Sequence, residues 1–445
     1  MSAARPEKKP PTTAPRFLAA LKQLAPHAHY ALAVSGGRDS MALVALAAAA
    51  KKKPNAPKFH VVSVDHGLRK QARHEMPLVA ETCQRVGLPH KVLRADTPLG
   101  AGGIQQAARE LRYRLIAGWC AARKIPALIV AHHLHDQAET LLMRLARGSG
   151  VDGLSGMARL QKLETVAGNL QILRPFLDTD PALLMRVVQR AKFDWIEDPS
   201  NQDDQYERVR WRQAANMLEE LGLTAPALAR TSANMRQMRD YLDAQVADWL
   251  LAHGGYHFCG FYSLDRAAFL RLPALLRARV LAQVMARIGP VKFAPSETSL
   301  SHANALMAAR THGGHTLGGC MIRWRSNEIM IGREAAALDG VPPMPLVRTG
   351  SVWDRRFFVE IRKGKKAKAG LFAAPLGAAG LAQLESAGLQ VLKGVPRCYL
   401  HVLPAVFDTT GLVSCPVLAH QNPVNMVAWQ PGAPYLRALN AMAGW

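Results

Sequence analysis

The segment Ser35–Ser40 has the residue types and spacing of a loop that binds phosphate. Its adjacent glycines let backbone N–H groups approach an anion closely, and the helix expected from Met41 to Ala50 adds partial positive charge at its N-terminus. A Walker A loop is excluded because its spacing demands a lysine after the second glycine. Asp39 beside bound phosphates implies an intervening Mg²⁺. The alternative is a glycine turn without a ligand, which also fits a doubly wound fold.

A second candidate for chemistry is a pair of carboxylates, Asp136 and Glu139, in a segment with helical periodicity. An apolar stripe predicts the side of this helix that packs in the core, and its members are Leu134, Ala138, Leu141, Leu142 and Leu145. With i, i+3 spacing, the two carboxylates are neighbours in the first turn of the opposite face. Acids in a first turn also stabilise a helix dipole without any ligand, so spacing alone leaves both roles open.

Strands alternating with helices must position these groups. Apolar runs predict strands over 30–34, 59–64 and 127–131, with a further strand around Val92 and Leu93. The helices expected between them predict an α/β domain with a doubly wound parallel sheet. Polar residues and a glycine directly follow the second strand, at the sheet edge where such folds bind ligands: Asp65, His66, Gly67 and Leu68.

The composition favours a protein with a polyanionic partner. Lys and Arg number 56 against 33 acids, giving a net charge of +23, so nucleic acid is the first expectation. The six cysteines lie far apart without a C-x-x-C pair, which predicts neither a zinc cluster nor a disulfide framework and favours a reducing cytosol. No apolar run approaches the roughly 20 residues of a membrane span, and the Pro- and Lys-rich start does not resemble an export signal. We therefore expect a cytoplasmic protein without a membrane partner, with a homodimer as an open alternative to a monomer.

The length of 445 residues allows two or three domains. We expect a mobile tail over 1–16, the α/β domain over 17–217, a helical domain over 218–337, a linker over 338–345 and a small mixed or β-rich domain over 346–445. Apolar periodicity predicts the longest helices of the second domain over 235–251 and 266–288. The linker contains three prolines, and short apolar runs between Gly and Pro are typical of the last segment.

The phosphate loop resembles the SGGxDS signature of the PP-loop ATP pyrophosphatases, which split ATP between its α and β phosphates to adenylylate a substrate. Further motifs over residues 30–212 resemble those of one group within that superfamily, the tRNA(Ile)-lysidine synthetase family. These motifs are Asp65–Arg69, Gln106–Arg109 with Arg112-Tyr113, His132–Thr140, Arg144–Gly150, Gly153–Met157, Arg174-Pro175, Trp195 with Glu197–Asn201, and Arg208 with Arg212. Two positions depart from the pattern: His135 stands where the family usually has the first Asp of a pair, and Val209 replaces an Asn.

The resemblance implies a role for each candidate residue. The ATP phosphates would be held by Ser35, Gly36, Gly37, Arg38, Asp39 and Ser40, with Asp39 also binding Mg²⁺, and the adenosine by the turn from Asp65 to Leu68. Arg109 would stabilise charge that develops on phosphate. Asp136 and Glu139 would bind lysine and act in catalysis. Arg208 and Arg212 would contact tRNA, although both fit a solvated helix face equally well.

The implied reaction is the ATP-dependent ligation of free L-lysine to C2 of the wobble cytidine of tRNA(Ile) with a CAU anticodon. The C2 oxygen is a poor leaving group, so it is first adenylated with release of pyrophosphate. The amine of lysine then displaces AMP. Two alternatives remain open from the sequence. One is another PP-loop tRNA-modifying enzyme such as a thiolase, a class that typically has paired cysteines, and the other is a non-catalytic RNA-binding protein with a relic loop.

Overall fold

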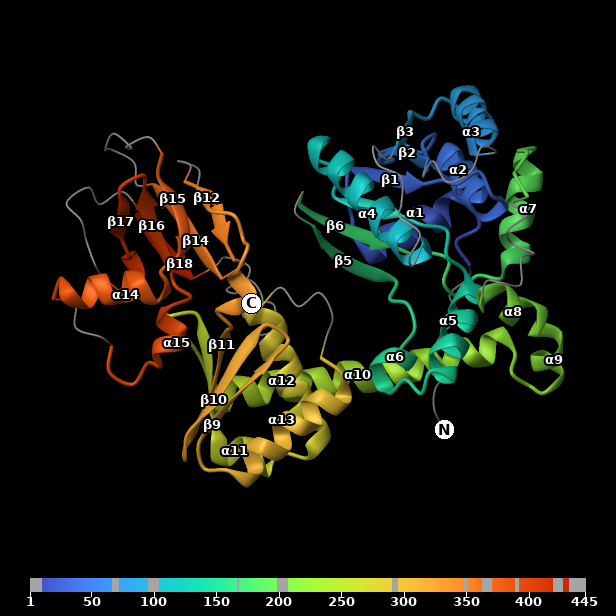
Figure 1. Ribbon diagram of the computed structural model, residues 1–445. Helices are drawn as coiled ribbons and strands as arrows, with labels where there is room; N and C mark the ends of the chain where they lie inside the picture. Colours follow the sequence, from blue (N-terminus) through green and yellow to red (C-terminus); the bar gives the residue numbers. More distant parts are fainter. Residues whose placement is uncertain are drawn as a thin grey trace. The chain divides into compact units, whose positions relative to one another are not determined.

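The computed structural model divides the chain into two units, Met1–Arg239 and Asp240–Trp445 (Figure 1). The described residues are 10–65, 72–94, 104–165, 168–197, 207–289, 295–346, 351–354, 356–361, 370–388, 392–418 and 427–431. The finer division into five segments expected from the sequence stays a prediction. None of the described helices is long and apolar enough to cross a membrane.

A six-stranded sheet with the order β3-β2-β1-β4-β6-β5 forms the centre of the first unit. Its strands are β1 (His29–Ala33), β2 (Lys58–Asp65), β3 (His90–Arg94), β4 (Ala127–Ile129), β5 (Leu160–Thr165) and β6 (Gly168–Leu173). All neighbours pair in parallel except the hairpin of β5 and β6. Because β2 and β4 flank β1 on opposite sides, the strand order reverses there. Such a reversal opens a crevice at the carboxyl ends of the strands.

Helices cover both faces of this sheet, which confirms the predicted doubly wound fold (Figure 1). The helices of the first unit are α1 (Ala14–Leu24), α2 (Arg38–Ala50), α3 (Ala72–Val86), α4 (Ile104–Ala122), α5 (Leu134–Ala146), α6 (Val151–Leu154), α7 (Pro181–Ala191), α8 (Glu207–Gln213), α9 (Ala215–Glu220) and α10 (Ala225–His253), the last continuing past Arg239. Along β1, Tyr30 and Leu32 join the core that contains α1, α2 and α7, whereas Ala31 joins the core that contains α4. This alternation follows from the two-residue period of a strand.

Helix α2 is buried on almost every side. From Ser40 to Ala50 only Ala49 is exposed. A helix that is apolar all round is expected inside a core rather than at a surface. Its burial fixes the position of its N-terminus, and therefore of the phosphate loop that precedes it.

The second unit begins with a five-stranded antiparallel sheet of order β7-β8-β11-β10-β9. Its elements are β7 (Gly254–His257), β8 (Phe261–Asp265), α11 (Arg266–Arg271), α12 (Ala274–Ile288), α13 (Glu297–Ala309), β9 (Gly313–Leu317), β10 (Cys320–Trp324) and β11 (Glu328–Arg333). The region predicted as helical therefore contains a sheet as well. The single helix expected over 266–288 is wrong, because Pro273 lacks the N–H that an uninterrupted helix needs and the segment forms α11 and α12.

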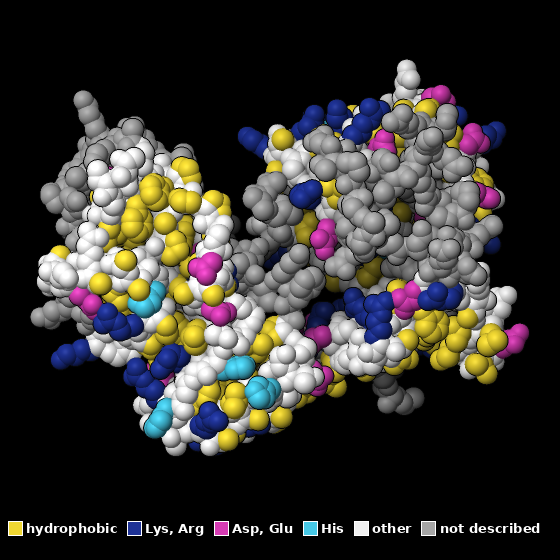
Figure 2. Space-filling model, viewed as in Figure 1, with side chains coloured by type: hydrophobic (Ala, Val, Ile, Leu, Met, Phe, Trp, Pro, Cys, Tyr) yellow, Lys and Arg dark blue, Asp and Glu magenta, His cyan; other side chains and the backbone are white. Residues whose placement is uncertain are grey.

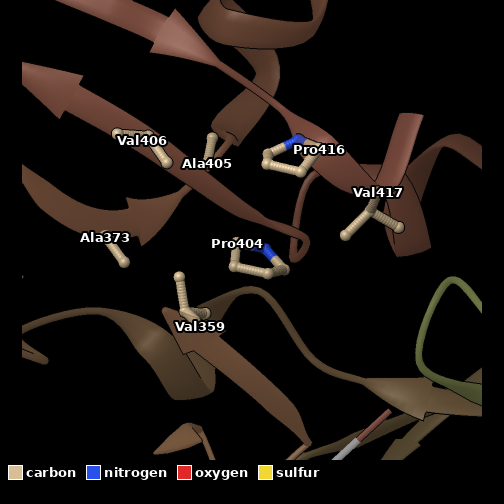
Figure 3. Close-up of a pocket in the computed structure, with 7 residues that line it drawn as sticks. All are labelled: Val359, Ala373, Pro404, Ala405, Val406, Pro416 and Val417. Carbon is tan, nitrogen blue, oxygen red and sulfur yellow. The ribbon is translucent and has the colours of Figure 1, made fainter. Parts of the chain in front are cut away.

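The C-terminal part of the second unit is mixed and rich in strands, as predicted. One sheet has the order β12-β15-β16-β17 and another the order β13-β14-β18. The elements are η2 (Ala336–Leu338), β12 (Met344–Pro345), β13 (Ser351–Trp353), β14 (Phe357–Ile361), β15 (Phe372–Pro375), α14 (Gly377–Ser386), α15 (Arg397–Leu400), β16 (Pro404–Asp408), β17 (Gly411–Ser414), η3 (Pro416–Leu418) and β18 (Val427–Pro431). A small pocket between these layers is lined entirely by apolar residues (Figure 3), namely Val359, Ala373, Pro404, Ala405, Val406, Pro416 and Val417. It offers no polar group to orient a ligand, so we assign it no binding role.

Candidate active site

The loop between β1 and α2 is supported by a distant segment of the chain. Gly36 has a φ of +87°, and a Cβ at this position would lie 2.5 Å from Ile196 Cδ1. The Gly36 carbonyl accepts a hydrogen bond of 3.0 Å from the Ile196 N–H. Inside the loop, Ser40 Oγ accepts from the Ser35 N–H at 3.3 Å and donates to the Gly37 carbonyl at 2.8 Å. The glycine at position 36 is therefore required both by its backbone conformation and by the closeness of Ile196.

We expect Gly36→Ala to lower the free energy of unfolding by more than about 2 kcal/mol, because a left-handed alanine costs roughly 1–2 kcal/mol and Ile196 must also move. Gly37→Ala is the matched control. Its φ is −69°, and the nearest atom to an added Cβ is Ser35 Oγ at 3.7 Å. That variant should lose no more than about 1 kcal/mol, the preference for glycine over alanine at an N-cap. Urea unfolding measures the free energy of unfolding of each variant. Equal losses in Gly36→Ala and Gly37→Ala would contradict the proposed support by Ile196.

A chain of charged groups connects the loop to α5. Asp39 Oδ2 lies 3.5 Å from His133 Nε2, and that nitrogen lies 3.6 Å from Asp136 Oδ2. Asp136 Oδ2 also accepts a hydrogen bond of 3.0 Å from the His133 backbone N–H, which caps the start of α5. The first carboxylate of the predicted pair is thereby fixed beside the phosphate loop.

The electrostatics of this chain favour the ionised forms of Asp39 and His133. Burial by itself raises the pKa of Asp39, but His133 and Arg38 outweigh that effect and hold the pKa below its usual value. Burial by itself lowers the pKa of His133, but the carboxylates of Asp39, Asp136 and Glu139 raise it above its usual value. Asp39 is thus an anion at neutral pH, next to the N-terminus of α2.

Asp39 fits the magnesium ligand expected from the sequence. Its Oδ1 atom is buried and lies 3.5 Å from Arg38 Nε, with no hydrogen-bond partner among the described residues. A hard carboxylate oxygen at a phosphate loop is a suitable ligand for Mg²⁺. The described residues contain no group of three or more His, Cys, Asp or Glu side chains that could enclose a metal ion. This fits Mg²⁺ bound with a nucleotide, which uses one or two carboxylates together with phosphate oxygens.

Arg212 lies against the predicted lysine-binding pair. Its Nε donates to Glu139 Oε1 at 2.6 Å, and its Nη2 lies 3.4 Å from Glu139 Oε2 and 3.6 Å from Asp136 Oδ1. Asp136 and Glu139 are 8% and 6% exposed, whereas the Arg212 side chain is 42% exposed. Burial by itself lowers the pKa of Arg212, but the nearby carboxylates outweigh it and raise that pKa. The pair is therefore buried, and a cation that reaches the surface offsets part of its negative charge.

The apolar stripe predicted for α5 is only partly correct. Ala138, Leu141 and Leu142 are buried and pack with Leu228 of α10. Leu145 is 56% exposed, so the prediction that it lies in the core is wrong. These residues pack against other helices rather than against the sheet, and the last turn of α5 extends beyond that contact.

The remaining predicted residues lie in several places. Asp65 is buried at the carboxyl end of β2, with Oδ2 3.9 Å from Arg94 Nε. His66, Gly67 and Leu68 lie outside the described residues. Arg109 is exposed on α4, its guanidinium 5.4 Å from the centre of the Tyr113 ring. No contact joins Arg109 to Asp39 among the described groups, so its catalytic role stays a prediction.

Two further residues that the family motifs single out are Arg208 and His135. Arg208 lies in α8, and its side chain is outside what the structure describes. The side chain of His135 is exposed, with its ring 6.0 Å from that of His133. His135 therefore stands at the margin of the site rather than inside the acid pair.

Sequence reasoning missed the positioning role of Arg174. This side chain is 1% exposed and donates to His132 Nδ1, the Ala158 carbonyl and Gln161 Oε1, at 3.2, 2.9 and 2.9 Å. Burial lowers the pKa of Arg174. The guanidinium contacts His132 in the segment between β4 and α5, directly before His133. The Arg-Pro motif was the available signal, but only the fold shows that it meets the His-His pair.

Comparisons with known proteins agree with these features. A family model described as a PP-loop domain matches residues 11–219. The chain is 34% identical over 395 residues to a tRNA(Ile)-lysidine synthase of Ruegeria pomeroyi, covering 88% of this chain and 89% of that protein. It is 29% identical over 422 residues to one of Anaplasma marginale, covering 90% and 86%. A solved structure of a U34-tRNA thiolase from Methanococcus maripaludis is 16% identical, with a TM-score of 0.41, covering 49% of this chain and 77% of that one.

Proposed function

Because the chain belongs to the tRNA(Ile)-lysidine synthase family, we propose that it ligates L-lysine to C2 of the wobble cytidine of tRNA(Ile) with a CAU anticodon, using ATP, in the cytoplasm. The observation that carries this proposal is the junction of Asp39, His133 and Asp136, with distances of 3.5 and 3.6 Å. It joins a phosphate loop to a buried carboxylate pair that suits an amine. This arrangement supports an activation site next to a site for an amine donor.

The first step is adenylation of the tRNA. Backbone N–H groups of the loop and the N-terminus of α2 bind the ATP phosphates. Asp39 would hold Mg²⁺, which would neutralise phosphate charge. The C2 oxygen of cytidine attacks the α-phosphate, a P–O bond forms, and the bond to pyrophosphate breaks. Arg109 is retained as a proposed partner for the developing charge.

The second step is the attack of lysine. Its amine forms a C–N bond to C2, AMP leaves with the former C2 oxygen, and the amine loses a proton. Asp136 and Glu139 bind the lysine and can accept that proton. Since Arg212 contacts both carboxylates, lysine binding must replace or rearrange some of these contacts. Arg208 and the exposed part of Arg212 are proposed to contact tRNA.

The net charge of +23 supports a polyanionic substrate. Figure 2 shows Lys and Arg side chains spread more widely than acidic ones over the face in view.

We propose that the residues beyond Leu218 supply much of the tRNA affinity, because an anticodon pocket alone offers few phosphate contacts. Binding of the full chain should weaken by at least about 100-fold between about 50 and 200 mM salt, as measured by filter binding. A tRNA affinity that stays constant over this range of salt concentration would contradict binding through the tRNA phosphates.

Transfer of sulfur by a thiolase is disfavoured by the state of the cysteines. All six thiols are free, and five of them are buried. Burial raises the pKa of Cys83 to about 11 and that of four others to about 12, namely Cys120, Cys259, Cys320 and Cys415. Burial also raises the pKa of Cys398. A sulfur carrier needs an accessible thiolate, which these sites disfavour.

We therefore expect the five buried cysteines to resist iodoacetamide at about pH 7.5 in the native protein, and all six to react in urea. Partly exposed Cys398 is the internal control for the native reaction. Peptide mass spectrometry locates each label. Rapid labelling of one of the five buried thiols in the native protein would contradict this expectation and revive the thiolase alternative.

The function itself is tested by mass spectrometry of a tRNA(Ile) transcript with a CAU anticodon after incubation with the full chain, ATP, Mg²⁺ and one candidate donor at a time. With L-lysine, the wobble nucleotide should gain the mass of one lysine less one water. A gain with a sulfur donor would identify a thiolase. Binding without any ATP-dependent change in mass would identify a non-catalytic RNA-binding protein.

A further inference from the structure

The segment Gly153–Met157 folds back onto the first turn of α5. Gln137 donates from Nε2 to the Met157 carbonyl at 3.1 Å, and its Oε1 accepts from the Met157 N–H at 2.8 Å. Gly156 has a φ of +65°, and a Cβ there would lie 2.8 Å from Gln137 Nε2. One buried amide thus satisfies both backbone groups of Met157, and the turn fits closely against it.

Helix α10 holds the same turn from its other side. Nη2 of Arg236 donates to the carbonyls of Ser155 and Met157, both at 2.7 Å. Nη1 of Arg239 lies 3.2 Å from Ser155 Oγ, and Ser155 is fully buried. The Met157 carbonyl therefore accepts hydrogen bonds from Gln137 and from Arg236. A charged donor makes the second of these the stronger kind of hydrogen bond.

Gln137 lies between the two carboxylates in sequence. Successive side chains of a helix point about 100° apart, so a rotation of α5 that moves Gln137 also turns Asp136 and Glu139. All three side chains are at most 8% exposed. Their directions are consequently set by contacts within the protein. Gln137 joins this turn of α5 to α10 through Met157, in addition to the apolar cluster that Ala138 forms with Leu228 of α10.

We propose that Arg236 is a positioning residue that acts through Met157 and Gln137 to orient Asp136 and Glu139 for the amine donor. This inference rests on the proposed function, because it takes L-lysine as that donor. Arg236 needs no contact with lysine in this arrangement. It holds the turn, and the turn holds Gln137. Gln137 then helps to set the rotation of α5, together with Arg144 of the same helix, which donates to the Gly153 and Gly156 carbonyls at 2.6 and 3.3 Å.

A purely structural role for Arg236 would have a different signature. Loss of a general anchor between helices would lower the fraction of active protein, and every partial reaction would fall by the same factor. Loss of a positioning contact would weaken lysine binding selectively. The loop before α2, which is proposed to bind ATP, has its own support from Ile196, and its link to α5 passes through His133, ahead of Gln137 in the chain.

The test compares Arg236→Met with Arg230→Met, an exposed arginine on the same helix. The KM for L-lysine is measured with full-length protein, ATP and the tRNA transcript, and adenylylation without lysine is measured as pyrophosphate release. For Arg236→Met, the KM for lysine should rise about 10-fold, below the 10²-fold that a misplacement of 1 Å can cause. Pyrophosphate release without lysine should stay within about twofold. Arg230→Met should match the wild type in both measurements.

A second pair of variants examines the chain of contacts itself. Gln137→Met breaks the other link and should raise the KM for lysine by a similar factor. The double variant should show about the same rise as either single variant, because both interrupt one path. Arg236→Lys keeps the charge and should restore part of the affinity. It also provides the comparison if Arg236→Met does not fold.

Three results would overturn the inference: an unchanged KM for lysine in Arg236→Met, an equal loss in both measurements, or a double variant whose effect is the product of the single ones. Failure of the proposed function is distinct from all three. In that case the wild-type protein itself would transfer no lysine to the tRNA.

Discussion

Asp39→Asn should reduce pyrophosphate release by at least about 100-fold while the protein stays folded. Asp39 has one buried carboxylate oxygen without a hydrogen-bond partner among the described residues and another 3.5 Å from His133 Nε2. An amide keeps the shape but removes the negative charge that would hold Mg²⁺ beside the phosphates. Partners in an outer shell around a metal already contribute 10–100-fold, so a direct ligand should contribute at least the upper value.

The matched control is Asp194→Asn, which removes an exposed carboxylate from the same unit. Pyrophosphate release is measured with saturating ATP, Mg²⁺ and tRNA, and circular dichroism verifies folding. The control should retain wild-type activity. Near-normal release by folded Asp39→Asn would show that the metal is held elsewhere and would remove Asp39 from the site.

The phosphate loop could be predicted because its determinants are local. An apolar run, followed by two glycines, two hydroxyls and a carboxylate within six residues, already predicts a strand, a turn and a helix N-terminus. The alternation of Tyr30, Ala31 and Leu32 between two cores likewise follows from the period of a strand. Such features depend on neighbours in sequence, so they can be deduced without the fold.

The partners of the site could not be predicted, because they come from far along the chain. Ile196 supports Gly36 across 160 positions, and Arg212 pairs with Glu139 across 73. Periodicity indicates which face of a helix is apolar but not where its contact ends, so the exposure of Leu145 was missed. For the same reason the sequence left Arg212 open between tRNA contact and a solvated helix face, and did not reveal its ion pairs with Glu139 and Asp136.

The buried pair provides the second large expected effect. Asp136→Asn and Glu139→Gln should each raise the KM for lysine by at least about 10-fold and leave adenylylation without lysine largely unchanged. An ammonium group offers three donors and one compact charge, which two neighbouring carboxylates can satisfy in a partly desolvated pocket. An amide keeps the volume of the side chain and removes its charge. The loss should therefore appear in binding of the donor rather than in binding of ATP.

The two variants should differ in how selectively they affect the lysine step. Because of the contacts with Arg212, Glu139→Gln should be the more selective of the two. Glu139 contacts Arg212 at 2.6 Å, whereas Asp136 also caps α5 and lies 3.6 Å from His133 Nε2. We expect Glu139→Gln to affect only the lysine step and Asp136→Asn to add a modest loss of stability. Urea unfolding of the two variants measures that difference, and the loss of an N-terminal cap contact costs roughly 0.5–2 kcal/mol.

The chemistry of attack limits what the pair can do. An adjacent anion raises the pKa of an amine, but only a neutral amine can attack C2. Both carboxylates therefore cannot hold the attacking nitrogen as a cation, unless one of them accepts its proton as the C–N bond forms.

Asp194→Asn, at an exposed carboxylate, again serves as the control for the loss of one negative charge. If Asp136→Asn and Glu139→Gln each lose lysine-independent adenylylation in parallel with lysine transfer, the pair serves ATP or Mg²⁺, and the assignment of the lysine site is wrong.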